Sequence, residues 1–185
     1  MEQIIEQAVA VLRRGGTILY PTDTIWGLGC DARNSAAVEK LYAIKERDRS
    51  KSMLVLVKDN SNNLNIPISL TDRPTTFILP REQWQEIFAE PLADNLAAAD
   101  GSLGIRVPDH PFCQKVIRLL GAPLVSTSAN LSGQPSPATY ADIAPELHSR
   151  VDYSVPPLPE FLSNETHGSR IVKVNPDGTQ TIIRP

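Results

Sequence analysis

The chain has few of the residues that mark several common classes of protein. Its two cysteines, Cys30 and Cys113, are too few for a disulfide framework or a cysteine-rich zinc site, so we expect core thiols and a reducing cytoplasm. No apolar run approaches the roughly 20 residues that a membrane span requires. The acidic, amphipathic N-terminus is unlike a signal peptide. These absences predict a cytoplasmic globular protein, in keeping with its 41% hydrophobic residues and dispersed charges.

The motifs of familiar catalytic sites are missing as well. The sequence has no His-Glu-x-x-His, no P-loop, no Gly-x-Ser-x-Gly and no Cys-x-x-Cys. Its three histidines, His110, His148 and His167, stand beside proline or on predicted helix ends, and we interpret them as surface residues. No nucleophile and no metal cage is evident. The net charge of -3 argues against general coating of nucleic acid, though not against a local basic patch.

Apolar residues recur at helical spacing in some segments and in short β-type runs in others. Helices are predicted at 2–14, from a capping Ser35 onward, at 111–120 and at 139–149. Residues 81–99 are also predicted to be helical, in two pieces divided by Pro91. Strands are predicted at 17–20, 52–57, 75–79, 103–108, from 122, and at 151–155, 170–174 and 179–184, the last two joined by a hairpin turn. Residues 59–73 are predicted to be a loop. The alternation predicts one α/β (α+β mixed) domain over residues 1–185, with a mixed sheet and flanking helices.

A hydroxyl-rich turn follows the first predicted strand. Residues 17–20 are β-branched or large and apolar, which suits a buried strand, and Pro21 should end it. Thr22, Asp23 and Thr24 would then stand at the carboxyl end of that strand, where many α/β proteins bind ligands. Taken alone, the stretch also fits a plain strand–turn–strand with polar turn residues.

A run of charges, Lys45-Glu-Arg-Asp-Arg-Ser-Lys51, precedes the strand at 52–57. If the run is extended, its side chains alternate, so all four cations point one way and both acids the other. The run then delivers four minus two charges, or +2, to one side and can bind anions. If the preceding helix continues instead, the same residues form a solvated face of mixed pairs. Residues 45–52 are also a candidate lid.

Two further segments combine an apolar strand with polar groups. Arg106 stands within the strand at 103–108, where an arginine either reaches solvent or meets an anion. The stretch 126–136 is rich in hydroxyls, which suit phosphates and carboxylates, although it also fits an ordinary Ser/Pro loop. Together with 22–24 and 45–51, these segments predict a site that binds anions and catalyses by positioning and charge neutralisation, as in phosphoryl or nucleotidyl transfer.

The order and spacing of these motifs resemble the YrdC family of threonylcarbamoyl-AMP synthases over nearly the whole chain. The motifs are Tyr-Pro-Thr-Asp-Thr-Ile-Trp-Gly-Leu-Gly-Cys-Asp, Lys45-x-Arg47, Leu103-Gly-Ile-Arg-Val-Pro and Ser126-Thr-Ser-Ala-Asn-x-Ser-Gly133. The resemblance implies a twisted mixed sheet around a concave basic cleft. It also implies an enzyme that joins L-threonine, bicarbonate and ATP into L-threonylcarbamoyladenylate and releases pyrophosphate. The product would serve the threonylcarbamoylation of adenosine 37 in tRNA, through downstream tRNA threonylcarbamoyl-transferase proteins of the TsaD type.

The resemblance also implies roles for individual residues. Lys45 and Arg47 would be catalytic and would hold the triphosphate and bicarbonate. The threonine and bicarbonate side of the site would comprise Thr22, Arg106, Ser126, Asn130 and Ser169. The nucleotide would be bound by Lys45, Arg47, Arg49, Ser102, Ser128, Ser136 and Arg184. ATP would be a substrate with Mg²⁺ carried on its phosphates, and no protein-ligated metal is expected.

Some positions depart from the family pattern, and two other functions stay open. Ser52 replaces a usual proline, Arg73-Pro-Thr75 replaces a commoner Pro-Gly-Pro turn, and Arg170 stands where threonine is usual. One alternative is an RNA-binding module that uses the basic cleft on double-stranded RNA or tRNA. The other is a carbamoyl-transfer paralogue of the same fold, like the related domain of hydrogenase-maturation proteins.

Overall fold

The strands of the computed structural model, which describes residues 1–48, 52–58, 73–163, 165 and 167–185, form one sheet. They are β1 (Ile18–Tyr20), β2 (Gly27–Gly29), β3 (Leu54–Leu56), β4 (Thr75–Leu79), β5 (Leu103–Arg106), β6 (Leu124–Ser128), β7 (Tyr153–Ser154), β8 (Arg170–Val174) and β9 (Gln180–Arg184). Their order in the sheet is β7-β1-β2-β6-β3-β5-β4-β8-β9. The loop expected at 59–73 lies almost wholly outside the described residues.

The sheet is mixed, as the alternating sequence pattern predicts. Strands β1 and β7, β3 and β5, and β4 and β8 pair in parallel. The other neighbouring strands pair antiparallel. Strand β6 is central because it bonds to β2 on one side and to β3 on the other, and so joins the two halves of the sheet.

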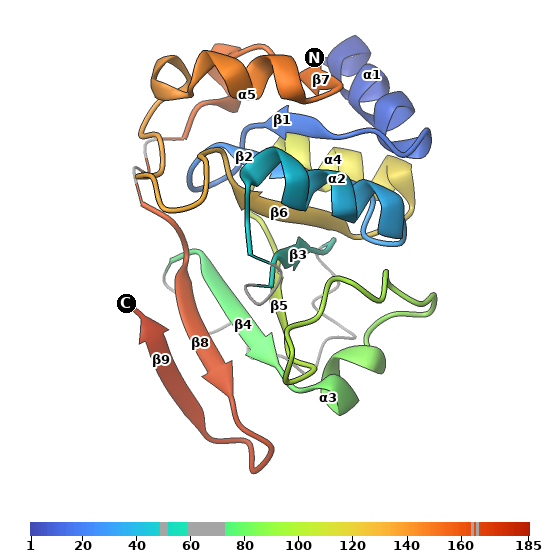
Figure 1. Cartoon of the computed structure of the whole chain (residues 1–185), viewed down its shortest axis with the longest axis vertical. Coiled ribbons are helices and arrows are strands. Elements are labelled where there is room, and N and C mark those ends of the chain that lie inside the picture. Colours follow the sequence, from blue (N-terminus) through green and yellow to red (C-terminus); the bar gives the residue numbers. More distant parts are fainter. Residues whose placement is uncertain (49–51, 59–72, 164, 166) are drawn as a thin grey trace.

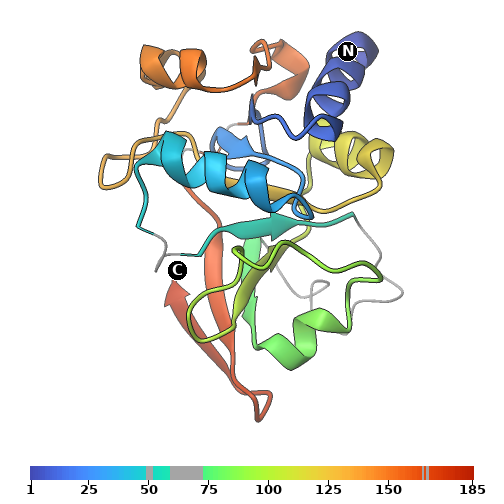
Figure 2. The same ribbon diagram turned by 45° about the vertical axis from the view of Figure 1, so that its right-hand side comes forward.

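The helices divide between the two ends of the molecule. Figure 1 shows α1 (Glu2–Arg13), α2 (Ser35–Lys45), α4 (Pro111–Leu120) and α5 (Pro145–Arg150) gathered around β1, β2 and β6. Helix α3 (Arg81–Gln85) and the β8–β9 hairpin lie at the other end, and the turned view in Figure 2 keeps this grouping. None of the helices within the described residues has the length and apolarity needed to cross a bilayer.

Local sequence explains where the main helices begin and end. Helix α1 buries Ile5, Ala8, Val9, Val11 and Leu12, the apolar face expected from the sequence, and packs on α4. Helix α4 begins with Pro111, whose missing N–H is unneeded there, and ends at Gly121 with φ 73°. The cap of α2 is Asn34 rather than the expected Ser35, since the Asn34 side chain accepts a hydrogen bond from Ala37 N at 3.0 Å.

The helix expected at 81–99 is wrong beyond Gln85. Trp84 donates its indole N–H to the carbonyl of Gly101 at 3.0 Å, which folds the chain back on itself. The following turns bury Leu92, Ala93 and Leu96 without helix, and Pro91 could not have donated an intrahelical bond. Long-range contacts therefore replace local helical ones in this segment.

The helix expected at 139–149 is divided. Thr139 and Asp142 form a capping box around the 3₁₀ turn η2 (Tyr140–Asp142). Ala144 is extended because it precedes Pro145, and α5 begins only at that proline. Past β7, a second 3₁₀ turn, η3 (Pro159–Phe161), leads the chain toward β8.

The close packing of β1, β2 and β6 predicts a large effect of replacing Gly29 by alanine. The new Cβ would press on the carbonyl oxygen of Val125 and lie 2.8 Å from the Tyr20 ring. Neither neighbour can withdraw, because Tyr20 is fully buried and its hydroxyl donates to that same carbonyl at 3.3 Å. We expect Gly29→Ala to lower the free energy of unfolding in urea by more than about 3 kcal/mol.

Gly178→Ala is the matched control for this change. Gly178 has φ +82° and open space around it, so alanine there should cost about 1–2 kcal/mol from backbone conformation alone. Equal losses from the two substitutions would contradict the packing described for β2.

Candidate active site

A pocket of about 250 Å³ is lined by residues from across the width of the sheet. Its walls come from the turn between β1 and β2, the ends of β3, β5 and β6, and from β4, β8 and β9. Arg47, Arg106 and Arg184 face it together with several hydroxyls, and no acidic side chain is among the described residues that line it. The pocket therefore suits anions.

Eight of the residues predicted from the sequence line this pocket, although they are far apart in the chain. They are Thr22, Arg47, Arg106, Ser126, Ser128, Ser136, Ser169 and Arg184. Lys45 and Asn130 lie beside it. Ser102 does not line it, since its hydroxyl donates to Asp100 Oδ1 at 2.6 Å. Arg49 lies outside the described residues.

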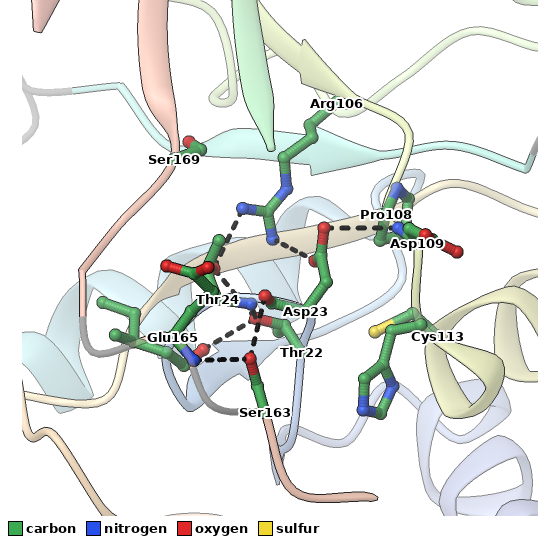
Figure 3. A network of polar contacts seen from close by, with 12 residues as sticks. Thr22, Asp23, Thr24, Arg106, Pro108, Asp109, Cys113, Ser163, Glu165 and Ser169 are labelled. Atoms are coloured by element: carbon green, nitrogen blue, oxygen red, sulfur yellow. Dashed lines mark hydrogen bonds and ion pairs between the residues drawn. The ribbon is translucent and has the colours of Figure 1, made fainter. Parts of the chain in front are cut away.

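Arg106 is the last residue of β5 and is only 4% exposed. Its Nη1 donates to Thr24 Oγ1 at 3.0 Å, and its Nη2 lies 3.2 Å from Asp23 Oδ1 (Figure 3). The expectation that this strand arginine meets an anion is confirmed, but the anion is a side chain of the protein. Arg106 Nε is buried and has no hydrogen-bond partner among the described residues.

The turn that holds Asp23 is organised by the hydroxyl of Thr22. Thr22 Oγ1 donates to the carbonyl of Ile25 at 2.8 Å and accepts from the Thr24 backbone N–H at 3.0 Å. Because its only hydrogen is used there, Thr24 is the donor in the 3.0 Å contact between the two hydroxyls. Hydrogen bonds therefore run from Arg106 through Thr24 and Thr22 to the Ile25 carbonyl.

Lys45 is 1% exposed and turns away from solvent, at the end of α2. Its Nζ donates to the carbonyls of Ser128 and Asn130, both at 2.6 Å. Burial, and then the nearby charge of Arg47, lower the pKa of Lys45 to about 7, while the two carbonyls favour the protonated amine. Lys45 thus holds the loop that follows β6.

Asn130 supports the same loop from within. Its side-chain amide donates to the carbonyls of Leu131 at 3.0 Å and Gln134 at 2.6 Å. The backbone N–H of Ser132 donates a hydrogen bond to the carbonyl of Lys45 at 2.9 Å. These contacts hold the loop from Ser128 to Gln134 against the end of α2.

Arg47 follows a sharp turn, because α2 ends at Lys45 and Glu46 takes a left-handed conformation with φ 51°. The continuous helix considered for the charge run is therefore wrong. Arg150 donates to Glu46 Oε1 at 2.8 Å and to the carbonyl of Ile44 at 3.2 Å, which stabilises the turn. Arg47 then donates to the carbonyl of Ser52 at 2.8 Å. The extended alternative depends on residues 49–51, outside the described residues.

The opposite wall is built from β4, β8 and β9. Ser169 Oγ lies 2.7 Å from Thr76 Oγ1, and Arg184 Nε donates to the Ser169 carbonyl at 2.9 Å. Partial burial, and then the charge of Arg106, lower the pKa of Arg184. Two guanidinium groups close enough to repel each other are a mark of an anion site.

Sequence reasoning missed several residues of the pocket. Thr76 lies in a strand that was predicted, but the sequence pattern indicated no functional role for this residue. In the structure Thr76 lines the pocket and contacts Ser169. Trp26 lines the pocket and packs on Tyr140, with ring centroids 4.7 Å apart. Asp23 was placed at the right turn, but nothing in the sequence linked it to Arg106.

The histidines and cysteines differ in how well they were predicted. His110 is buried rather than on the surface, because its Nε2 lies 3.1 Å from the carbonyl of Phe161 in the wall of the core. Burial lowers its pKa. Cys30 and Cys113 are buried free thiols, as expected. Within the described part of the chain, no group of three or more His, Cys, Asp or Glu could hold a metal ion.

Comparison with known proteins matches the chain to a family and to individual relatives. The Sua5/YciO/YrdC family model, which carries the description "Telomere recombination", matches residues 10–185. The threonylcarbamoyl-AMP synthase of Xanthomonas campestris pv. campestris (strain B100) is 36% identical over 161 residues, covering 80% of this chain and 82% of that protein. That of Pseudoalteromonas translucida (strain TAC 125) is 34% identical over 183 residues, covering 92% of each.

A solved structure shares the fold. The P. abyssi Sua5 structure, described as complexed with L-threonine, superposes with a TM-score of 0.80 at 21% identity. The match covers 98% of this chain and 53% of that one, so the chain spans about half the length of P. abyssi Sua5.

The buried amine of Lys45 predicts a pH-dependent contribution to stability. With its pKa lowered to about 7, Lys45 binds fewer protons in the folded chain than in the unfolded chain between about pH 7 and its ordinary value of 10.5. Folding of the wild type should therefore be favoured, relative to Lys45→Met, as the pH rises through that window. The difference in free energy of unfolding between the two proteins should change by up to about 1.4 kcal/mol per pH unit, the value for one proton.

Urea unfolding of wild type and Lys45→Met at about pH 6.5, 8 and 9.5 measures this difference. Because the two proteins differ only in the titratable group of residue 45, the contributions of all other ionisations cancel in the comparison. Parallel pH curves for the two proteins would show that Lys45 keeps its ordinary pKa in the fold.

Proposed function

The chain belongs to the Sua5/YciO/YrdC family, and from this premise we propose that it is a threonylcarbamoyl-AMP synthase. It joins L-threonine, bicarbonate and ATP, and releases L-threonylcarbamoyladenylate and pyrophosphate for modification of adenosine 37 in tRNA. The observation that carries the proposal is one pocket lined by three arginines and several hydroxyls from segments far apart in the chain. A reaction that brings together ATP, bicarbonate and the carboxylate of L-threonine needs such a set of cations and neutral donors.

Arg106 anchors the threonine end of the site in this proposal. Its Nη1 and Nη2 each keep a hydrogen beyond their contacts with Thr24 and Asp23, and a carboxylate satisfies a guanidinium through paired hydrogen bonds. Ser126 and Thr22 line the same part of the pocket, and Ser169 with Thr76 offers hydroxyls from the opposite wall. These groups suit a small amino acid with its own hydroxyl.

The triphosphate lies toward Arg47 and Arg184 in this arrangement, with Ser128 and Ser136 on the nucleotide. Lys45 and Asn130 act by holding the loop between these serines, because their polar atoms are bound to backbone carbonyls. Mg²⁺ on the phosphates would neutralise charge on the leaving pyrophosphate. Since the described lining has no carboxylate, phosphate oxygens would hold that ion.

The residues act by positioning, since the substrates themselves supply the nucleophiles. The amine of threonine attacks the carbon of bicarbonate, a C–N bond forms and water leaves, which yields the carbamate. A carbamate oxygen then attacks the α-phosphorus of ATP in line with the departing pyrophosphate. Arg106 orients the amino acid, and Arg47 and Arg184 offset the negative charge that gathers between the reacting groups.

We further propose that residues 1–185 act as one catalytic domain in the cytoplasm and supply a transferase of the TsaD type. Pocket residues run from Thr22 to Arg184, which supports a single working unit. The product is a reactive mixed anhydride of carbamate and phosphate, so it suits direct use by an enzyme acting on tRNA. Direct RNA binding would depend on the charge run at 45–51, of which 49–51 lie outside the described residues.

Incubation with ATP, bicarbonate and isotopically labelled L-threonine tests the activity. We expect pyrophosphate to appear only when all three are present, together with labelled threonylcarbamoyladenylate. ATP turnover that is indifferent to threonine would contradict the proposal, and a different carbamoylated product would identify a carbamoyl-transfer paralogue.

Arg106→Lys should raise the KM for L-threonine roughly 10- to 100-fold with a much smaller change in the KM for ATP. Lysine keeps the charge but loses the planar fork of donors that a carboxylate accepts. Steady-state kinetics with each substrate varied in turn measure both constants. Arg33→Lys is the matched control, because Arg33 pairs with Asp31 and Glu90 away from the pocket lining. A threonine KM unchanged from wild type would remove Arg106 from the threonine site.

A further inference from the structure

Asp23 and Arg106 form a buried ion pair behind the pocket. The Asp23 side chain is 7% exposed and that of Arg106 4%. Burying two charges is costly, and replacing such pairs by apolar residues is often neutral or stabilising, so stability alone is a poor reason for the pair. Its position against the pocket suggests that the pair serves the ligand.

The contacts of Arg106 use only part of its guanidinium. Nη1 donates to Thr24 and Nη2 faces Asp23, whereas Nε is buried without a hydrogen-bond partner among the described residues (Figure 3). A carboxylate binds a guanidinium through two parallel N–H groups, and Nη1 and Nη2 each keep one hydrogen that these contacts do not use. Because Arg106 lines the pocket, these two hydrogens can meet a planar carboxylate there.

Asp23 is held from three directions, so it cannot move aside when a ligand arrives. Its Oδ2 accepts from the backbone N–H of Asp109 at 3.2 Å, and its carbonyl accepts from Ser163 Oγ at 3.0 Å. Ser163 Oγ in turn accepts from the Glu165 backbone N–H at 3.0 Å, as Figure 3 shows. The negative charge behind Arg106 is thus a fixed feature of the site.

The two arginines on either side of the pocket differ in what balances their charge. Arg106 is paired with a carboxylate, so the pair is neutral before a ligand binds. Arg184 donates to the carbonyl of Ser169, and no described carboxylate pairs with it. A phosphate group with its full charge is repelled by Asp23 at the first arginine and meets an unopposed cation at the second.

We propose that Asp23 is a specificity-determining positioning residue that sorts the amino acid from the triphosphate within the pocket. It orients the Nη hydrogens of Arg106 for the single carboxylate of a zwitterionic amino acid and repels phosphate from that place, which directs the triphosphate toward Arg184. This role rests on the proposed function. It assigns Asp23 no contact with the reacting atoms, because the residue acts through Arg106.

Asp23→Asn tests the sorting, because asparagine keeps the shape and one oxygen but removes the charge. The KM for L-threonine should rise roughly tenfold while the KM for ATP stays within about twofold. Inorganic phosphate should compete with L-threonine in Asp23→Asn, whereas in the wild type it should compete with ATP only. If Asp23 only stabilised the fold, Asp23→Asn would not change which of the two substrates is displaced by inorganic phosphate. Asp94→Asn, an exposed site with the same change of charge, is the matched control.

Thr24 provides a second test that keeps the ion pair. Thr24→Val removes the acceptor for Arg106 Nη1 at constant shape and should raise the threonine KM several-fold, whereas Thr24→Ser keeps the hydroxyl and should restore the KM.

Calorimetry on the wild type provides a third test. Titration with L-threonine should give the same affinity with and without inorganic phosphate.

The outcomes separate the sorting role from the proposed function. If the wild type binds L-threonine but phosphate displaces it, or if phosphate competes with threonine no better in Asp23→Asn, the sorting role is wrong and the proposed function stands. If the wild type binds no L-threonine at all, the proposed function fails and the sorting role falls with it.

Discussion

Cationic side chains around the pocket are held in place by oxygen atoms from distant parts of the chain. Arg106 is held by the turn at 23–24, Arg184 by the Ser169 carbonyl, Arg47 by the Ser52 carbonyl and Lys45 by the loop after β6. Long, flexible side chains of this kind lose much conformational freedom when ordered, so each depends on its acceptor. If these contacts were lost, like charges would move apart and the pocket would lose its anion-binding shape. The fold is therefore coupled to the site through these hydrogen bonds.

The topology of the sheet explains how such distant segments meet. Strand β6 joins the half containing β1 and β2 to the half containing β3, β4 and β5, and its end carries Ser126 and Ser128. The β8–β9 hairpin adds to the far edge and returns Arg184 toward the same pocket (Figure 1). Each polar group therefore stands at a strand end or a turn, where the backbone can place it without breaking the ladder.

Much of this arrangement could be predicted from the sequence, because its signals are local. Apolar periodicity and the residues of turns predicted α1, α4 and the β8–β9 hairpin, and strand ends rich in hydroxyls predicted Thr22, Ser126 and Ser128 in the pocket. Ser169 and Arg184 were predicted only from the family resemblance. The pairing of Asp23 with Arg106 could not be predicted, because it depends on how β5 packs against a distant turn. Arg106 and Thr24, which that packing brings into contact, are 82 residues apart in the sequence. The same holds for the burial of the Lys45 amine, because the sequence showed only a charge run that could either bind anions or form a solvated face. The helix predicted at 86–99 was wrong because tertiary contacts replaced the helical tendency of this segment.

The central claim is that one pocket holds both the amino acid and the nucleotide, with the carboxylate on Arg106 and the phosphates on the opposite arginine. A crystal structure with L-threonine and a non-hydrolysable ATP analogue tests it most directly. We predict the threonine carboxylate on the Nη atoms of Arg106 and the triphosphate near Arg47 and Arg184. Phosphate bound at Arg106, or either ligand bound outside this pocket, would contradict it.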